Sequence, residues 1–269
     1  FWEESRIVAV DCPSGVDCQT GEVSPGTLKA GLTICLDSLK LGMLKEPAIG
    51  ICGEFEVVDL DLARFSPEIG SKSMLVIDKQ AVNKTLPIRS DIAHKGTFGK
   101  VIVVGGCTNF TGAPVLAGRG AYAMGTGLVQ VAAPEIIQRC CAGGNLEMTW
   151  LILDDVDGVI SEPAADTIFS HLEGASALVI GPGMGREDTT RRFIQRLLFE
   201  GNEAGMTKSM GFAGMVATVQ GKKEAKLPPA VLDADALTML AGEKDWPTRI
   251  KTKMVLTPHP GEMSRLTGL

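Results

Sequence analysis

The sequence of 269 residues lacks several features by which common classes of protein are recognised. Aromatic residues make up only 5%, and the net charge of −6 repels a phosphate backbone. Few rings are therefore present to stack on bases, and no apolar run is long enough to span a bilayer. We expect neither nucleic acid nor a membrane as a partner, although a small nucleotide can still bind at a local loop.

No Cys-x-x-Cys pair occurs, so a zinc site or a thioredoxin-like redox motif has no support. An odd number of cysteines without framework spacing indicates reduced thiols, and free cysteine is also a common buried residue. We therefore expect a cytoplasmic protein without disulfides. The seven cysteines are Cys12, Cys18, Cys35, Cys52, Cys107, Cys140 and Cys141.

Short apolar, β-branched runs alternate with segments of helical spacing along most of the chain. Such alternation predicts parallel βαβ units, and Pro134 suits the first turn of a helix. The Pro, Gly and Ser of SPEIGSKS break the pattern and predict a linker at 66–75 between domains at 1–65 and 76–269. The predicted strands lie in RIVAVD, LTICLD, FEVVDLDL, KVIVVGG, GLVQVAAP, TWLILDD, ALVIGPG, AVLDAD and MVLTPHP; the predicted helices lie at 78–86, 112–125, 134–141 and 187–200.

Glycine-rich loops follow two of the predicted strands, at the strand ends where ligands bind in such folds. GPGMG at 181–185 precedes a helix, but it is not the dinucleotide fingerprint, and a tight turn explains it equally well. Gly105 and Gly106 end another strand, and Gly112 with Ala113 opens the next helix. Small residues there leave room for a flat ligand or for close packing of the helix on the sheet.

Two further loops carry side chains suited to chemistry. His259 lies between two prolines in TPHPGE, which fixes its backbone, and it either binds a substrate or has a structural role. Asp11 and Ser14 in DCPSG follow the first predicted strand. The carboxylate suits acid–base work and the hydroxyl suits a hard cation, whereas the alternative is a cap or turn.

Taken in order, these motifs resemble the NAD(P)H-hydrate repair family. VAVDCPSGVDCQTGEV resembles a segment of its epimerase domain, and HKGTFGKVIVVGG, GPGMG, VLDADAL and LTPHPGEMSRL resemble its dehydratase domain. The resemblance implies an α/β fold: the C-terminal part of a Rossmann-like epimerase, then a ribokinase-like domain with a mostly parallel sheet flanked by helices. It implies an isomerase that interconverts the epimers of hydrated NADH and NADPH (NADHX and NADPHX). It also implies an ADP- or ATP-driven lyase that dehydrates the S epimer, with Mg²⁺ and K⁺.

The resemblance also assigns residues. It implies a substrate contact at Asp11 and a potassium ligand at Ser14, and it places hydrate contacts at Ala113, Gly183 and His259. Asp233 of DADAL matches an acidic position of the family whose role stays open. We also expect a homo-oligomer.

Several family features are missing from the sequence. The early loop of the epimerase would precede Phe1, and the G-x-G-D motif of the dehydratase would follow Leu269. We therefore expect a chain truncated at both ends, with an incomplete ribokinase-like domain and no dehydratase turnover of its own. Residues 202–227 resemble an insertion, for which a mobile surface loop is expected. The alternatives are a kinase of a small alcohol or vitamin precursor, which would lack the DCPSG half, and a non-catalytic nucleotide-binding remnant.

We predict that all seven cysteines are free thiols, because their spacing matches no disulfide framework. Thiol titration of denatured protein purified without reductant should find seven reactive groups per chain. A stable pair that needs reduction before it reacts would contradict the expectation.

Overall fold

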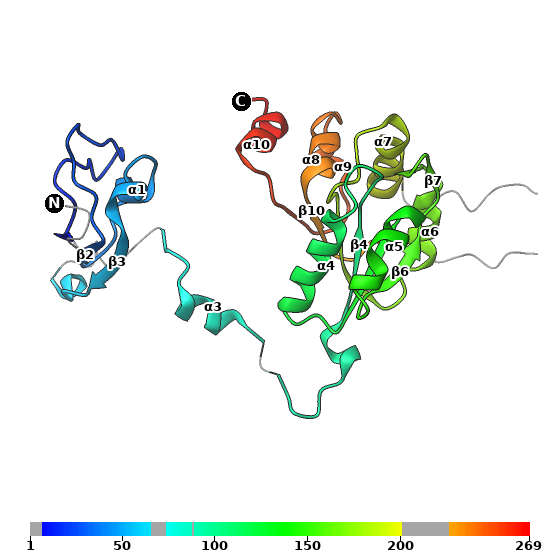
Figure 1. Ribbon diagram of the computed structural model, residues 1–269, viewed down its shortest axis with the longest axis horizontal. Helices are drawn as coiled ribbons and strands as arrows, with labels where there is room; N and C mark the ends of the chain where they lie inside the picture. The colour runs from blue at the N-terminus through cyan, green and yellow to red at the C-terminus, as the bar shows by residue number, and fades with distance from the viewer. Residues whose placement is uncertain (1–6, 66–73, 88, 201–225) are drawn as a thin grey trace, which may run out of the picture. The chain divides into compact units, whose positions relative to one another are not determined.

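The computed structural model describes residues 7–65, 74–87, 89–200 and 226–269. The chain divides into two compact units, Phe1–Ile88 and Arg89–Leu269 (Figure 1). Most of the predicted linker at 66–75 and of the predicted insertion at 202–227 falls outside the described residues. All seven cysteines are described, and none of them forms a disulfide.

The first unit is built on a parallel sheet of three strands in the order β1-β2-β3. β1 covers Val8–Val10, β2 covers Leu32–Leu36 and β3 covers Glu54–Val58, as the apolar runs predict. Its small core consists of Val16, Cys35, Met43, Ala48 and Cys52. The unit also contains the short helices η1 (Leu41–Leu44), α1 (Ile49–Cys52), η2 (Leu62–Arg64) and α3 (Lys79–Thr85).

The second unit contains a six-stranded sheet in the order β11-β10-β9-β4-β5-β6, and every neighbouring pair is parallel. The chain runs outward from β4 through β5 to β6 and then returns to β9 on the other side of β4. The strand order thus reverses between β4 and β9, although the two strands are parallel. Ligands of α/β folds bind where the strand order reverses. The strands are β4 (Lys100–Val104), β5 (Leu128–Ala133), β6 (Thr149–Ile152), β9 (Ala175–Ile180), β10 (Ala230–Leu232) and β11 (Met254–Leu256).

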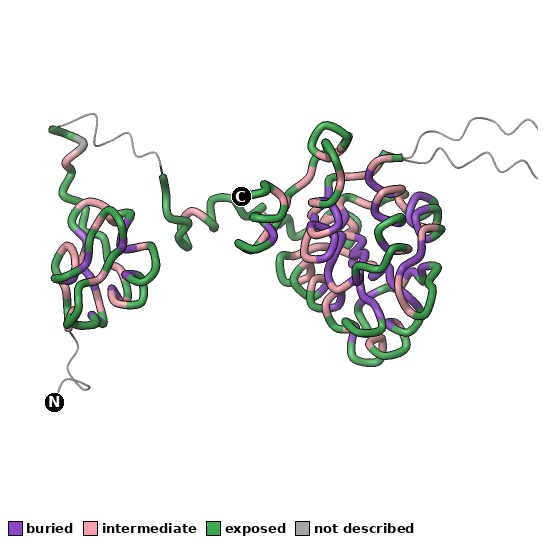
Figure 2. Tube along the Cα trace, turned by 90° about the horizontal axis from the view of Figure 1, so that it is seen from above, coloured by how far each residue is buried: buried purple, intermediate pink, exposed green. Residues whose placement is uncertain are grey.

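Helices cover both faces of this sheet because its strands are apolar on both sides. Ile102 and Val104 of β4 pack in one core cluster with residues of α6, α7 and α8. Val103 between them packs in the opposite cluster with Val115 of α4 and Ile137 of α5. Buried segments run through the middle of this unit (Figure 2). The helices are η3 (Lys95–Phe98), α4 (Ala113–Ala123), α5 (Glu135–Cys141), η4 (Ala142–Gly144), α6 (Ala164–Ser170), α7 (Asp188–Gln195), η5 (Arg196–Glu200), α8 (Ala234–Ala241), α9 (Trp246–Arg249) and α10 (Pro260–Thr267).

The structure confirms an α/β fold with a parallel sheet flanked by helices, and it corrects details. Pro134 is the N-cap of α5 and not part of its first turn. The sequence interpretation also missed the hairpin of β7 (Asp155–Val156) and β8 (Val159–Ile160), since strands of two residues show no alternation. No helix in the described part of the chain is long and apolar enough to cross a membrane.

We predict that Phe193→Ala strongly destabilises the second unit. Phe193 is fully buried on α7, and removing a buried aromatic ring costs about 3–5 kcal/mol. Leu116→Ala on α4 is the control, because Leu116 is 66% exposed and surface changes usually cost less than about 0.5 kcal/mol. Urea unfolding followed by circular dichroism should separate the two variants. Equal midpoints would contradict the assigned core.

Candidate functional site

Two glycine loops meet where the strand order of the sheet reverses. Gly105 and Gly106 follow β4, and Gly181 to Gly185 follow β9. The amide of Gly106 donates to the carbonyl of Pro182 at 2.9 Å. A Cβ atom on Gly105 would lie 2.4 Å from the same oxygen, so the loops touch backbone to backbone. Glycine is required here because any side chain would separate the loops.

The structure brings Gly183 and Ala113, two of the predicted substrate contacts, together. Gly183 has a φ of +62°, and a Cβ atom on it would lie 2.9 Å from the Cβ of Ala113 and 2.8 Å from the Cβ of Phe110. Ala113 is the first residue of α4, so the helix start lies against the glycine loop. Phe110 keeps 54% of its surface exposed beside this contact. A flat ligand would thus meet small residues, backbone amides and one aromatic ring.

His259, the third predicted contact, begins α10 and caps it. Its Nδ1 accepts from the amide of Gly261 at 3.1 Å, so Nε2 carries the proton of the neutral ring. Glu262 accepts from the amide of His259 at 3.0 Å, and its other carboxylate oxygen lies 3.3 Å from Nε2. The imidazole is 63% exposed, whereas the carboxylate of Glu262 is buried. The ring is therefore held by its own helix and still faces solvent.

His259 does not touch the pair formed by Gly183 and Ala113. It follows β11, and β10 separates β11 from β9 in the sheet. At a strand spacing of about 4.8 Å, the two loops begin roughly 10 Å apart.

The DAD segment between β10 and α8 links these loops, a role that the sequence did not reveal. The hydroxyl of Thr257 donates to Asp233 Oδ1 at 2.8 Å. Asp235 accepts from the amide of Gly185 at 3.1 Å and from Arg186 Nε at 2.7 Å. Asp235 lies 50 residues from its partner Gly185, so no local pattern could have found the pair.

In the first unit, Asp11 directly follows β1 with a φ of +67°. Its Oδ1 accepts from the amide of Leu36 at 3.1 Å and pairs with the ammonium group of Lys40. The hydrogen bond from Lys40, followed by that from Leu36, lowers the pKa of Asp11. The side chain is an anion with a cation beside it, not a cap on a helix. Lys40 was missed because it follows the neighbouring strand, 29 residues away.

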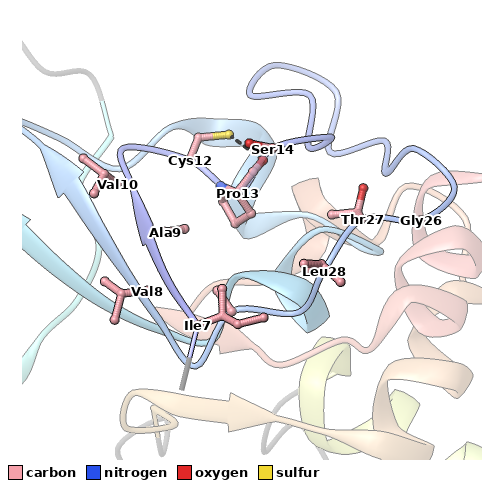
Figure 3. Close-up of a pocket in the computed structure, with 11 residues that line it drawn as sticks. Ile7, Val8, Ala9, Val10, Cys12, Pro13, Ser14, Gly26, Thr27 and Leu28 are labelled. Carbon is pink, nitrogen blue, oxygen red and sulfur yellow. Dashed lines mark hydrogen bonds between the residues drawn. The ribbon is translucent and has the colours of Figure 1, made fainter. Parts of the chain in front are cut away.

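A hollow of about 450 Å³ lies beside β1 in this unit (Figure 3). Ser14, Cys12 and Pro13 line one part of it, and Thr27 and Leu28 line another. Ser14 lines the hollow, whereas Asp11 does not. Burial raises the pKa of the Cys12 thiol to about 12, which leaves it protonated and unreactive at neutral pH.

The described residues contain no group of three or more His, Cys, Asp or Glu side chains that could hold a metal ion. Mg²⁺ usually keeps several waters and binds through substrate phosphates with one or two carboxylates. The described part of the chain therefore offers no protein cage for Mg²⁺. For K⁺ it offers the exposed hydroxyl of Ser14, which is a suitable oxygen ligand but only one of the several that such an ion needs.

The parallel sheet and the glycine loops at its reversal define a ribokinase-like α/β protein. A similar fold occurs in a ribokinase-like superfamily protein of Enterococcus faecalis V583, with a TM-score of 0.51 at 19% identity over 72% of this chain and 56% of that one. Residues 101–269 match the family model described as NAD(P)H-hydrate dehydratase, and the chain belongs to that family. Residues 3–42 match the YjeF-related protein N-terminus. The family resemblance seen in the motifs is thereby confirmed.

Individual relatives agree with this assignment. The chain is 33% identical over 264 residues to a bifunctional NAD(P)H-hydrate repair enzyme of Moorella thermoacetica, covering 98% of this chain and 45% of the relative. It thus spans about half the length of the curated relatives that it matches. An ADP/ATP-dependent NAD(P)H-hydrate dehydratase from Bacillus subtilis, co-crystallised with ATP and Mg²⁺, is 28% identical with a TM-score of 0.50 over 71% of this chain and 55% of that one.

We predict that Gly183→Ala destabilises the protein more than Gly174→Ala. Both glycines have positive φ angles, +62° and +71°, where alanine costs roughly 1–2 kcal/mol. A Cβ on Gly174 meets nothing within 4 Å, whereas one on Gly183 collides with Phe110 and Ala113. Crowding of this kind adds about 1–3 kcal/mol. Urea midpoints that are equal for the two variants would show that the loop is not packed against α4.

We also predict that Asp11 titrates below the ordinary range of an aspartate, because Lys40 donates to its charged form. The carboxylate contributes stability at pH values above its unfolded pKa, and that contribution is lost as pH falls through its lower folded pKa. Nuclear magnetic resonance of the carboxyl carbon measures the pKa directly. Lys40→Met should raise the pKa toward its usual value, and an unchanged pKa would contradict the pairing.

Proposed function

We propose that the protein carrying this sequence repairs hydrated NADH and NADPH. It dehydrates the S epimer in a nucleotide-driven lyase reaction, and its first unit belongs to an isomerase that interconverts the two epimers. One observation carries the proposal: the two family matches occur in the order of the bifunctional relatives, and the second contains the glycine loops that meet where the sheet reverses.

The dehydratase residues would act mainly by positioning. Gly183 and Ala113 bring backbone close to the ligand, since neither carries a bulky side chain that could exclude it. His259 presents an exposed imidazole whose Nε2–H could donate to a hydroxyl or an amide oxygen of the hydrate, while Glu262 holds the backbone amide of His259. When bound, ADP or ATP with Mg²⁺ would supply the phosphoryl group that turns the hydroxyl of the hydrate into a leaving group. Preference for ADP is proposed from the family alone.

The epimerase half rests on fewer residues. Asp11 is the proposed substrate contact, and Lys40 keeps it ionised. A carboxylate with a lowered pKa is a weak base, so it suits hydrogen bonding to the substrate hydroxyl better than proton abstraction. Ser14 on the rim of the hollow is the proposed potassium ligand, in keeping with its exposed hydroxyl.

Location and assembly are proposed on less direct grounds. Seven unpaired cysteines favour a reducing compartment, so we propose a cytoplasmic protein. A homo-oligomer stays a prediction. The expected partners are the small molecules NADHX and NADPHX.

The test, made on the complete protein, is recovery of NADH from its hydrate, followed by the near-ultraviolet absorbance of the reduced ring, with ADP or ATP present. Recovery that depends on the nucleotide is the expected result. The ribokinase-like fold also suits a kinase of a small alcohol, although the match of residues 3–42 speaks against it. Phosphorylation of vitamin alcohols without recovery of NADH would establish the kinase instead. Inactivity toward both would favour a non-catalytic nucleotide-binding protein.

We predict that, in the complete protein, Asp11→Asn abolishes epimerisation and leaves dehydration of the S epimer intact, because Asp11 lies in the first compact unit with its own core. Each epimer is supplied separately, and its disappearance is followed by chromatography. Asp17→Asn in the same unit is the control, since Asp17 Oδ1 accepts from the local amides of Gln19 and Thr20. Loss of both activities in Asp11→Asn would mean that the two units share one site.

A further inference from the structure

Two carboxylates at the start of α8, Asp233 at its N-cap and Asp235 in its first turn, contact different loops. Asp233 and Asp235 lie on either side of Ala234, whose φ of +50° is in the left-handed region. Residues other than glycine rarely adopt that conformation, and they do so where surrounding structure imposes it. The left-handed residue lets one aspartate face the loop after β11 and the other face the loop after β9.

Asp235 holds the glycine loop that follows β9. Its side chain is only 12% exposed, and it accepts from the amide of Gly185 at 3.1 Å and from Arg186 Nε at 2.7 Å. Hydrogen bonds to a buried charge are strong, because the carboxylate would otherwise be left without solvent or partners. Gly185 is two residues from Gly183, so these hydrogen bonds fix the segment that packs on Ala113.

Asp233 reaches the other loop. The hydroxyl of Thr257 donates to Asp233 Oδ1 at 2.8 Å and to the carbonyl of Leu232 at 3.1 Å. Thr257 lies two residues before His259. The backbone of Asp233 also packs on the glycine loop, since a Cβ on Gly181 would lie 1.8 Å from its carbonyl oxygen. One three-residue turn therefore contacts both loops that are proposed to face the substrate.

We propose that Asp233 and Asp235 are positioning residues, which hold the glycine loop and the His259 loop in register so that both can bind one reduced nicotinamide dinucleotide. The binding part of this inference rests on the proposed function, whereas the positioning part rests on geometry alone. Neither carboxylate contacts the reacting atoms in this account.

A purely structural role is the alternative, because an acidic residue in the first turn of a helix stabilises that helix. Asp166 provides the matched control. It lies in the first turn of α6 and pairs with Arg196 through two contacts of 2.8 Å, but it touches neither loop. Asp166→Ala therefore removes a first-turn aspartate and an arginine partner without releasing the glycine loop.

Hydrogen exchange of the chain tests positioning without any ligand. Asp235→Ala should speed the exchange of the Gly185 amide at least about tenfold, the loss expected when a buried hydrogen bond is removed. Asp166→Ala should leave this amide unchanged. Thr257→Val should speed the exchange of the amides of Gly261 to Met263. Thr257→Ser, which keeps the hydroxyl, should leave their exchange as slow as in the original chain. Equal exchange of the Gly185 amide in Asp235→Ala and Asp166→Ala would overturn the proposal.

Titration with NADPH, followed by its own fluorescence, then tests the binding part. Asp235→Ala should raise the Kd about tenfold relative to the original chain, and Asp166→Ala should leave it unchanged. If Asp235→Ala does not fold, Asp235→Asn keeps the volume and one acceptor and should give an intermediate Kd. An unchanged Kd in a folded Asp235 variant would overturn the proposal. Failure of the original chain to bind NADPH would count against the proposed function, while the exchange result would still decide positioning.

Discussion

The backbone contact between the loops after β4 and β9 is the constraint on which the larger unit depends. The hydrogen bond from Gly106 to Pro182 joins the loops that follow β4 and β9, between which the strand order reverses. From this point the chain leads into α4 on one face and into α7 on the other. The contact requires glycine at Gly105, where a Cβ would collide with Pro182. The same residues therefore set the fold and bring the two loops together after their strands.

Carboxylates also hold loops that follow strands in each of the two units. Asp235 accepts from the glycine loop, Glu262 accepts from the backbone of His259, and Asp11 of the first unit pairs with Lys40. Asp235 and Glu262 are buried, so their hydrogen bonds determine the conformation of the loop that each one holds. Several of the acidic residues thus stabilise loops that follow strands.

The sequence predicts the strands well because they are short apolar runs rich in β-branched residues and bounded by Gly, Pro or Asp. The resemblance assigns Gly183 and Ala113 to one ligand, and the structure brings the two residues together, but the strand order that does so was not read from the sequence. The contact partners of individual side chains could not be predicted from the sequence. Lys40 lies 29 residues from Asp11, and Gly185 lies 50 residues from Asp235. Such pairs depend on which strands become neighbours. The two-residue strands of the β7–β8 hairpin were missed because alternation needs longer runs.

The central claim is that the loops after β4, β9 and β11 form one binding surface for a reduced nicotinamide dinucleotide. Backbone amide shifts measured by nuclear magnetic resonance during titration of the chain with NADPH test it most directly. The account predicts that the shifts concentrate in residues 105–113, 181–186 and 257–262. Shifts confined to the hollow beside β1, or an absence of shifts in the two glycine loops at saturating NADPH, would contradict it.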